Sequence, residues 1–340
     1  MNLEIKRNEV IKFLRKYNLD SKDYKTRVVL AAPAYGNKNE LRVYMNGGNV
    51  GKIALNKKGI TTGISKKYSN KYNGIAPEAV YILEKNSRYS ESDRLDSLID
   101  LNYLKYAQEA TTTYSVKSAN DSDRERAIET LIMDYRNQKY GNAAIDMEIQ
   151  YSVKDHFGWT RNKQDGHVYP STMKYRKHEW FNEEFFCDSD DTKSPRVDLM
   201  VLNDAGIGFV ELKVDNENCE NLSSHIRHMN YILSHPDVFI SDADRRLSVL
   251  TEYHLIEPEM LTNQEKWIRN HQIWCGLMFV GTADKLDGAK RMIKKELSNI
   301  QNIKCCFVDI SAVRERRLNM KSDIFISKET FISSEYLGER

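Results

Sequence analysis

The chain has 340 residues, of which 40% are apolar and 10% aromatic, with 51 Lys and Arg and 49 Asp and Glu. This length allows one large domain or two ordinary ones, and the apolar content excludes wholesale disorder. No apolar run is long enough to span a bilayer, and residues 1–7 carry charge where a signal peptide needs an apolar segment. The five cysteines form no CxxC pair, so we expect free thiols in a cytoplasmic protein without a membrane partner.

The distribution of turn-forming and small polar residues divides the chain into two expected domains. Residues 1–110 are predicted to form a smaller β-rich, basic domain, residues 111–122 a polar linker, and residues 123–340 a second domain. Glycines in the first domain mark tight turns between short β-type segments. Its expected elements are a helix over 3–17, a strand over 26–34, hairpins over 40–65 and a helix over 92–109.

After the linker the hydrophobic pattern predicts an α/β fold with a mixed sheet. A capping box, in which the side chains of Ser122 and Glu125 satisfy each other's backbone donors, begins the first helix. This helix is expected to continue to about residue 140, where Gly141 ends it. Strands and further helices then alternate, as in a layered α/β core. The expected strands are 143–151, 180–187, 196–202, 207–214, 273–280 and 305–310, and the further helices are 221–234 and 284–298.

Basic residues are concentrated in one part of the first domain. Between Leu41 and Pro77 there are seven basic residues and no acidic ones, interleaved with tyrosines that could stack on bases. This pattern is typical of a nucleic-acid-binding surface, although lysines also keep exposed edge strands soluble, and charge alone leaves both interpretations open. The residues of this stretch predicted to contact nucleic acid are Lys52, Lys57, Lys58, Lys66, Lys67 and Lys71.

Three charged residues interrupt two apolar strands in the second domain. Asp198 lies in the strand over 196–202, and Glu211-Leu212-Lys213 lies in the strand over 207–214, with a turn sequence between them. Buried carboxylates and an ammonium group are costly unless they serve each other or a metal, and carboxylates from adjacent strands suit Mg²⁺. The alternative is a structural ion pair made by Lys213. A second acid beside such a pair, however, adds a negative charge that the lysine does not neutralise, and a bound cation would neutralise it.

These residues resemble the PD-(D/E)XK nuclease superfamily, and the resemblance covers residues 122–285. It implies a restriction-endonuclease-like α-β-β-β-α-β core with a mixed sheet. It also implies that Asp198, Glu211 and the backbone carbonyl of Leu212 bind Mg²⁺, for which Mn²⁺ can substitute, and that Lys213 is catalytic. One feature departs from the motif, because Pro195 stands three positions before Asp198 rather than directly before it.

Many members of the superfamily place a further glutamate on the first core helix, facing the metal. The candidates here are Glu125 and Glu129. Because Glu125 has a role in the predicted capping box, we expect Glu129 to serve catalysis and metal binding, with Glu125 as its substitute. The alternative is that Glu129 pairs with Arg126 or Arg136 on the surface.

Two other regions supply candidate contacts to nucleic acid. Residues 154–177 include six basic residues and two acidic ones, so they could line a substrate groove, but a solvated loop fits equally well. On the expected helix over 221–234, the resemblance implies polar contacts to the scissile phosphate, and partly exposed histidines without such a role are the alternative. The residues chosen from these regions are Arg161, Lys163, His225 and His228.

The sequence thus predicts a Mg²⁺-dependent nuclease, an endonuclease acting on DNA, whose first domain binds the substrate. Analogy suggests restriction or antiviral defence and, as in many relatives, a homodimer. Two alternatives remain: a nucleic-acid-binding or assembly subunit with an inactive core, and a nuclease that acts on RNA.

Overall fold

The structure of this chain is a computed structural model, and it describes a defined set of residues. These are 8, 28–32, 40–55, 60–64, 90–92, 104, 107, 108, 111, 121–133, 143–150, 159–161, 168–170, 196–215, 222–234, 236–253, 255, 256, 273–296, 302–315 and 317–327. The strand expected over 180–187 and most of the helices expected over 3–17 and 92–109 lie outside this set. So do six of the basic residues predicted to bind nucleic acid, namely Lys57, Lys58, Lys66, Lys67, Lys71 and Lys163.

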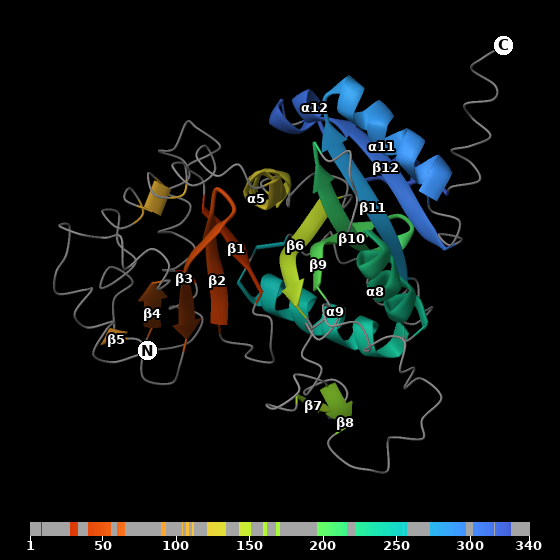
Figure 1. Ribbon diagram of the computed structural model, residues 1–340. Coiled ribbons are helices and arrows are strands. Elements are labelled where there is room, and N and C mark those ends of the chain that lie inside the picture. Colours follow the sequence, from red (N-terminus) through yellow and green to blue (C-terminus); the bar gives the residue numbers. More distant parts are fainter. Residues whose placement is uncertain are drawn as a thin grey trace.

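A mixed sheet of five strands lies within residues 143–309, in the expected second domain (Figure 1). Its strands follow the order β12-β11-β10-β9-β6, in which β10, β11 and β12 run parallel and β9 is antiparallel to both of its neighbours. The predicted α/β fold with a mixed sheet is therefore confirmed. The strands are β6 (Ala143–Gln150), β9 (Arg196–Asn203), β10 (Gly206–Val214), β11 (Ile273–Gly281) and β12 (Ile303–Asp309).

Helices cover both faces of this sheet, which explains why its central strand is buried along its whole length. All nine residues of β10 are buried, as expected for a strand with packed layers on either side. Alternate residues of β10 face opposite ways: Phe209 packs in a core with α8, α9 and α11, and Val210 in a second core with α5 and α12. The helices are α5 (Asp121–Met133), α8 (Leu222–Ser234), α9 (Pro236–Glu252), α11 (Ala283–Glu296) and α12 (Ile310–Arg314).

Helix α9 was not predicted. Pro236 follows the end of α8, as expected for a residue that stops a helix, but it is also the first residue of α9. Proline is tolerated there because its missing N–H has no helical acceptor in the first turn. The ring of Phe239 in α9 meets that of Tyr231 in α8 edge to face, with centroids 6.1 Å apart. Within the described residues, no helix combines the length and the apolar character needed to cross a membrane.

The first domain contributes an antiparallel sheet of five strands in simple chain order. Asn46 and Gly47, with φ values of 46° and 78°, form the tight turn between β2 and β3 in the left-handed region that these two residue types tolerate. A separate hairpin is made by β7 (Trp159–Arg161) and β8 (Val168–Pro170). The five strands of the sheet are β1 (Val28–Ala31), β2 (Glu40–Met45), β3 (Gly48–Leu55), β4 (Ile60–Ile64) and β5 (Ser90–Ser92).

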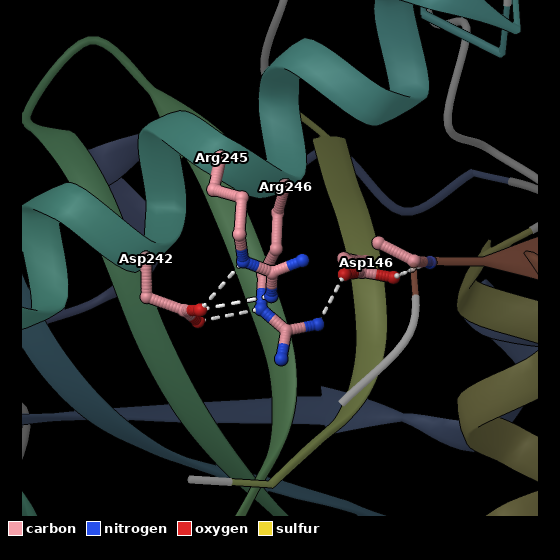
Figure 2. A network of polar contacts seen from close by, with 5 residues as sticks. Asp146, Asp242, Arg245 and Arg246 are labelled. Atoms are coloured by element: carbon pink, nitrogen blue, oxygen red, sulfur yellow. Dashed lines mark hydrogen bonds and ion pairs between the residues drawn. The ribbon is translucent and has the colours of Figure 1, made fainter. Parts of the chain in front are cut away.

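A buried ion network joins the two sheets to α9 (Figure 2). Arg246, which is fully buried, lies 2.8 Å from Asp146 of β6 and 2.7 Å from Asp242, and Arg245 is 2.8 Å from the other oxygen of Asp242. The Ala32 N–H, at the end of β1, donates a 3.0 Å hydrogen bond to Asp146. We call Asp146, Asp242, Arg245 and Arg246 the arginine network. Two carboxylates and two guanidinium groups balance one another, so this network holds β1, β6 and α9 together.

Candidate active site

The hairpin of β9 and β10 brings an aspartate and a glutamate to the same end of the sheet. The two strands pair in antiparallel register as far as Leu199 and Val210. The next residues, Asp198 and Glu211, therefore stand at the open end of the hairpin. There the Leu212 N–H donates a 2.8 Å hydrogen bond to Asp198 Oδ2, and Glu211 is buried with only 3% of its surface exposed.

The ammonium group of Lys213 is the point on which several predicted metal ligands converge. Its Nζ lies 2.8 Å from Glu211 Oε1, 3.0 Å from the Leu212 carbonyl oxygen and 3.2 Å from Glu125 Oε1 of α5. These contacts bring together residues that lie as many as 88 positions apart in the chain. We call Asp198, Glu211, Lys213 and Glu125 the lysine cluster.

Helix α5 brings Glu125 to this cluster. The helix begins at Asp121, so Ser122 lies inside it rather than at its N-cap, and the Glu125 carboxylate contacts Lys213. Glu129, the residue preferred from the sequence, is buried one turn further along α5 with 1% of its surface exposed. The predicted capping box is therefore not formed, and Glu125, the substitute candidate, contacts Lys213. A role for Glu129 in catalysis or metal binding stays a prediction.

Helix α8 adds an imidazole to the site. His225 Nδ1 lies 2.8 Å from Glu211 Oε1, so the same carboxylate oxygen faces both the histidine and Lys213. His225 is half-buried, and His228, which is also half-buried, lies three residues further along the same helix. The structure thus brings His225 into the site through Glu211.

The charges of the lysine cluster do not balance. Burial favours the neutral form of Glu211, but Lys213 and His225 outweigh it and lower the pKa of this carboxyl to about 2. Burial, reinforced by the charge of Glu211, raises the pKa of Asp198 well above its usual value, and burial also raises the pKa of Glu125. For Lys213, burial opposes the charge, yet the three acids raise its pKa, so it stays an ammonium. Within the described part of the chain, one lysine therefore satisfies Glu211 but leaves the other two acids short of positive charge.

The donor groups of the cluster are those that Mg²⁺ prefers, namely carboxylate and carbonyl oxygens. In the part of the chain that the structure describes, no three His, Cys, Asp or Glu side chains are already arranged around a metal position. The Lys213 ammonium lies instead at the point where Glu211, Glu125 and the Leu212 carbonyl meet. The donor atoms and the excess negative charge of these residues suit a divalent cation. In the structure, the Lys213 ammonium contacts the oxygens that would bind it.

The structure describes little of the predicted nucleic-acid surface. Lys52 of β3 forms a 2.9 Å ion pair with Glu40 of β2, one residue before the acid-free stretch, so its charge has a partner on the neighbouring strand. Arg161 is the last residue of β7. Contacts of the predicted lysines and of Arg161 with nucleic acid stay predictions. Sequence reasoning missed the arginine network. Asp242, Arg245 and Arg246 have the i,i+3 and i,i+4 spacings of helical ion pairs, a local signal that could have been found, but Asp146 lies 100 positions before Arg246.

Comparisons of this chain with protein-family models, with curated proteins and with solved structures found no match. The fold and the site define only the class of protein: an α/β protein with a carboxylate–lysine cluster in its mixed sheet, at the open end of the β9–β10 hairpin. Any function assigned to it rests on the chemistry of that cluster.

Proposed function

We propose that this protein is a Mg²⁺-dependent nuclease of the PD-(D/E)XK superfamily that hydrolyses phosphodiester bonds in DNA. The observation that carries the proposal is the lysine cluster, in which Asp198, Glu211 and Glu125 share the single ammonium of Lys213. A structural ion pair needs one carboxylate, and a further cation would stabilise the second and third acids as anions.

The order of elements supports the same proposal. Helix α5, strand β6, the hairpin of β9 and β10, helix α8 and strand β11 follow one another along the chain. This order is compatible with the α-β-β-β-α-β series that the resemblance implies, if the β7–β8 hairpin is an insertion between β6 and β9, α9 an insertion after α8, and α11 and β12 additions at the end. Asp198 and Glu211 stand on the second and third of these strands, where the superfamily carries its metal-binding acids.

In the proposed reaction, Asp198, Glu211, Glu125 and the Leu212 carbonyl would hold Mg²⁺. A bound Mg²⁺ ion activates water and offsets charge on the phosphate. Lys213 acts as a hydrogen-bond donor, because its raised pKa keeps it protonated, and it therefore orients the attacking water or stabilises a phosphate oxygen. His225 holds the carboxylate of Glu211 in place from α8. The expected products carry 5′-phosphate and 3′-hydroxyl ends.

The test is cleavage of supercoiled plasmid DNA and of labelled RNA, with Mg²⁺ and with EDTA. We expect wild-type protein to cut DNA only with Mg²⁺, and Glu211→Gln and Lys213→Met to lose at least about a hundredfold in rate. Lys290→Met is the matched control, since Lys290 also pairs with an acid, Asp287 at 3.3 Å, on the surface of α11. Activity that survives in Glu211→Gln would overturn the proposal.

One observation favours a second candidate, a nucleic-acid-binding subunit with an inactive core. The Lys213 ammonium already contacts the oxygens that a metal needs, as it would in a site that had become purely structural. Wild-type protein that binds DNA but neither cleaves it nor binds Mn²⁺ would establish this alternative. Cleavage of RNA alone would assign the substrate to RNA. A role in restriction or antiviral defence and assembly as a homodimer both stay proposals.

A further inference from the structure

The turn between β2 and β3 of the first domain lies directly against α5, the helix that carries Glu125. The Gly47 N–H donates a buried 2.7 Å hydrogen bond to the Thr130 hydroxyl, and the two residues are 83 positions apart. The same hydroxyl donates a 2.9 Å hydrogen bond to the Arg126 carbonyl. One hydroxyl group therefore links the turn of the first domain to the backbone of the residue that follows Glu125.

The turn fits this helix only because residue 47 has no side chain. A Cβ atom on Gly47 would lie 2.5 Å from Arg126 Cβ and 2.7 Å from Ala127 N, distances that packed atoms do not adopt. Either the turn or the helix would have to move to admit it. The close approach is to Arg126 and Ala127, so a displaced helix would change the position of Glu125 relative to Lys213.

Other contacts hold the first domain and α5 in one packed unit (Figure 1). Val29 and Tyr44 of the first sheet belong to the same hydrophobic core as Ile128 and Leu131 of α5. Helix α5 in turn packs on β6 and β10 of the mixed sheet. The helix is thus held between the two sheets, and its position depends on both.

We propose that the β2–β3 turn positions Glu125 in the lysine cluster, so that the first domain completes the active site and is not a separate binding module. Gly47 and Thr130 are positioning residues in this arrangement, since they act on the site through α5. The inference rests on the proposed function, because it assigns the turn a role in divalent metal binding by Glu125.

The test measures Mn²⁺ affinity by electron paramagnetic resonance, together with the thermal midpoint, for variants on each side of the contact. Gly47→Ala should weaken Mn²⁺ binding by about tenfold and Thr130→Val, which keeps the shape but loses the hydroxyl, by about threefold, as for supporting partners of metal ligands. Thr130→Ser keeps the hydroxyl and should restore wild-type affinity. Gly48→Ala is the control at the adjacent position, where φ is not in the left-handed region.

A double-mutant cycle with Glu125→Gln separates positioning from general destabilisation. If the turn acts through Glu125, Gly47→Ala and Thr130→Val should cause no further loss of Mn²⁺ affinity once that carboxylate is absent. Equal losses with and without the Glu125 carboxylate, or unchanged affinity in both single variants, would overturn the inference and leave the proposed function standing. Wild-type protein that binds no Mn²⁺ would overturn both.

Discussion

The arginine network and the lysine cluster are both buried groups of charged side chains, but they differ in charge balance. In the arginine network, Asp146 and Asp242 face Arg245 and Arg246 at 2.7–2.8 Å. Among the described residues of the lysine cluster, by contrast, three carboxylates lie near one ammonium group, with His225 beside Glu211.

The difference appears in the proton affinities of the acids. Although burial alone would raise it, the pKa of Asp242 is lowered by Arg246 and Arg245, so this carboxylate is fully compensated. The pKa of Asp198 is raised well above its usual value, first by burial and then by Glu211. Balanced charges are typical of a cluster that holds a fold together, whereas an excess of one sign is typical of a site that binds something of the other sign.

The largest expected effect on stability comes from breaking the balanced network. Arg246→Met leaves Asp146 buried without its cation and Asp242 with Arg245 alone, so it should lower the free energy of unfolding by about 3–5 kcal/mol. Urea denaturation measures this loss. Arg317→Met is the control, because Arg317 pairs with Glu315 on the surface and its loss should cost no more than about 0.5 kcal/mol. Equal effects of the two variants would show that the buried network does not hold the fold.

Removing Lys213 from the lysine cluster should strengthen metal binding. Lys213→Met removes the cation that competes for Glu211 and Glu125, so we expect Mn²⁺ affinity to rise by about tenfold even as cleavage is lost. Isothermal titration calorimetry measures the affinity, and Lys290→Met should leave it unchanged. Weaker Mn²⁺ binding in Lys213→Met would mean that the lysine supports the metal site and does not occupy it.

A smaller effect is expected from neutralising the acid whose pKa is raised. Because folding raises the pKa of Asp198, the metal-free protein should lose stability as pH rises from about 4 through the folded-state pKa. Asp198→Asn removes this loss. In EDTA, the free energy of unfolding of the variant minus that of wild type should therefore increase between pH 5 and pH 8, by on the order of 1 kcal/mol. Urea unfolding at pH 5 and pH 8 measures the difference.

Asp242→Asn is the matched comparison, because folding shifts the pKa of Asp242 in the direction opposite to that of Asp198. Folding lowers the pKa of Asp242, so its contribution is present above the unfolded pKa of about 4 and is lost as pH falls through the folded value. This variant should therefore be destabilised at both pH 5 and pH 8. If Asp198→Asn behaved in the same way, the two clusters would not differ as their charges indicate.

Much of the second domain follows from local patterns. The strands expected over 196–202 and 207–214 are β9 and β10, because their apolar runs and the turn sequence between them are short-range signals. The same signals placed Asp198, Glu211 and Lys213 on one hairpin, and the structure brings them together at its open end. Helix α9 escaped notice because Pro236 was taken only as a stop, although it suits the first turn of a helix equally well.

The sequence by itself determined the sheet, its buried hairpin and the acids and lysine of that hairpin, because period-two patterns and turn residues act over a few neighbouring positions. Only the tertiary structure decided that Glu125 reaches Lys213, that Glu40 neutralises Lys52 and that Gly47 of the first domain packs on α5. These contacts join residues on different strands or helices, and their geometry depends on how whole elements pack. No spacing along the chain encodes that packing.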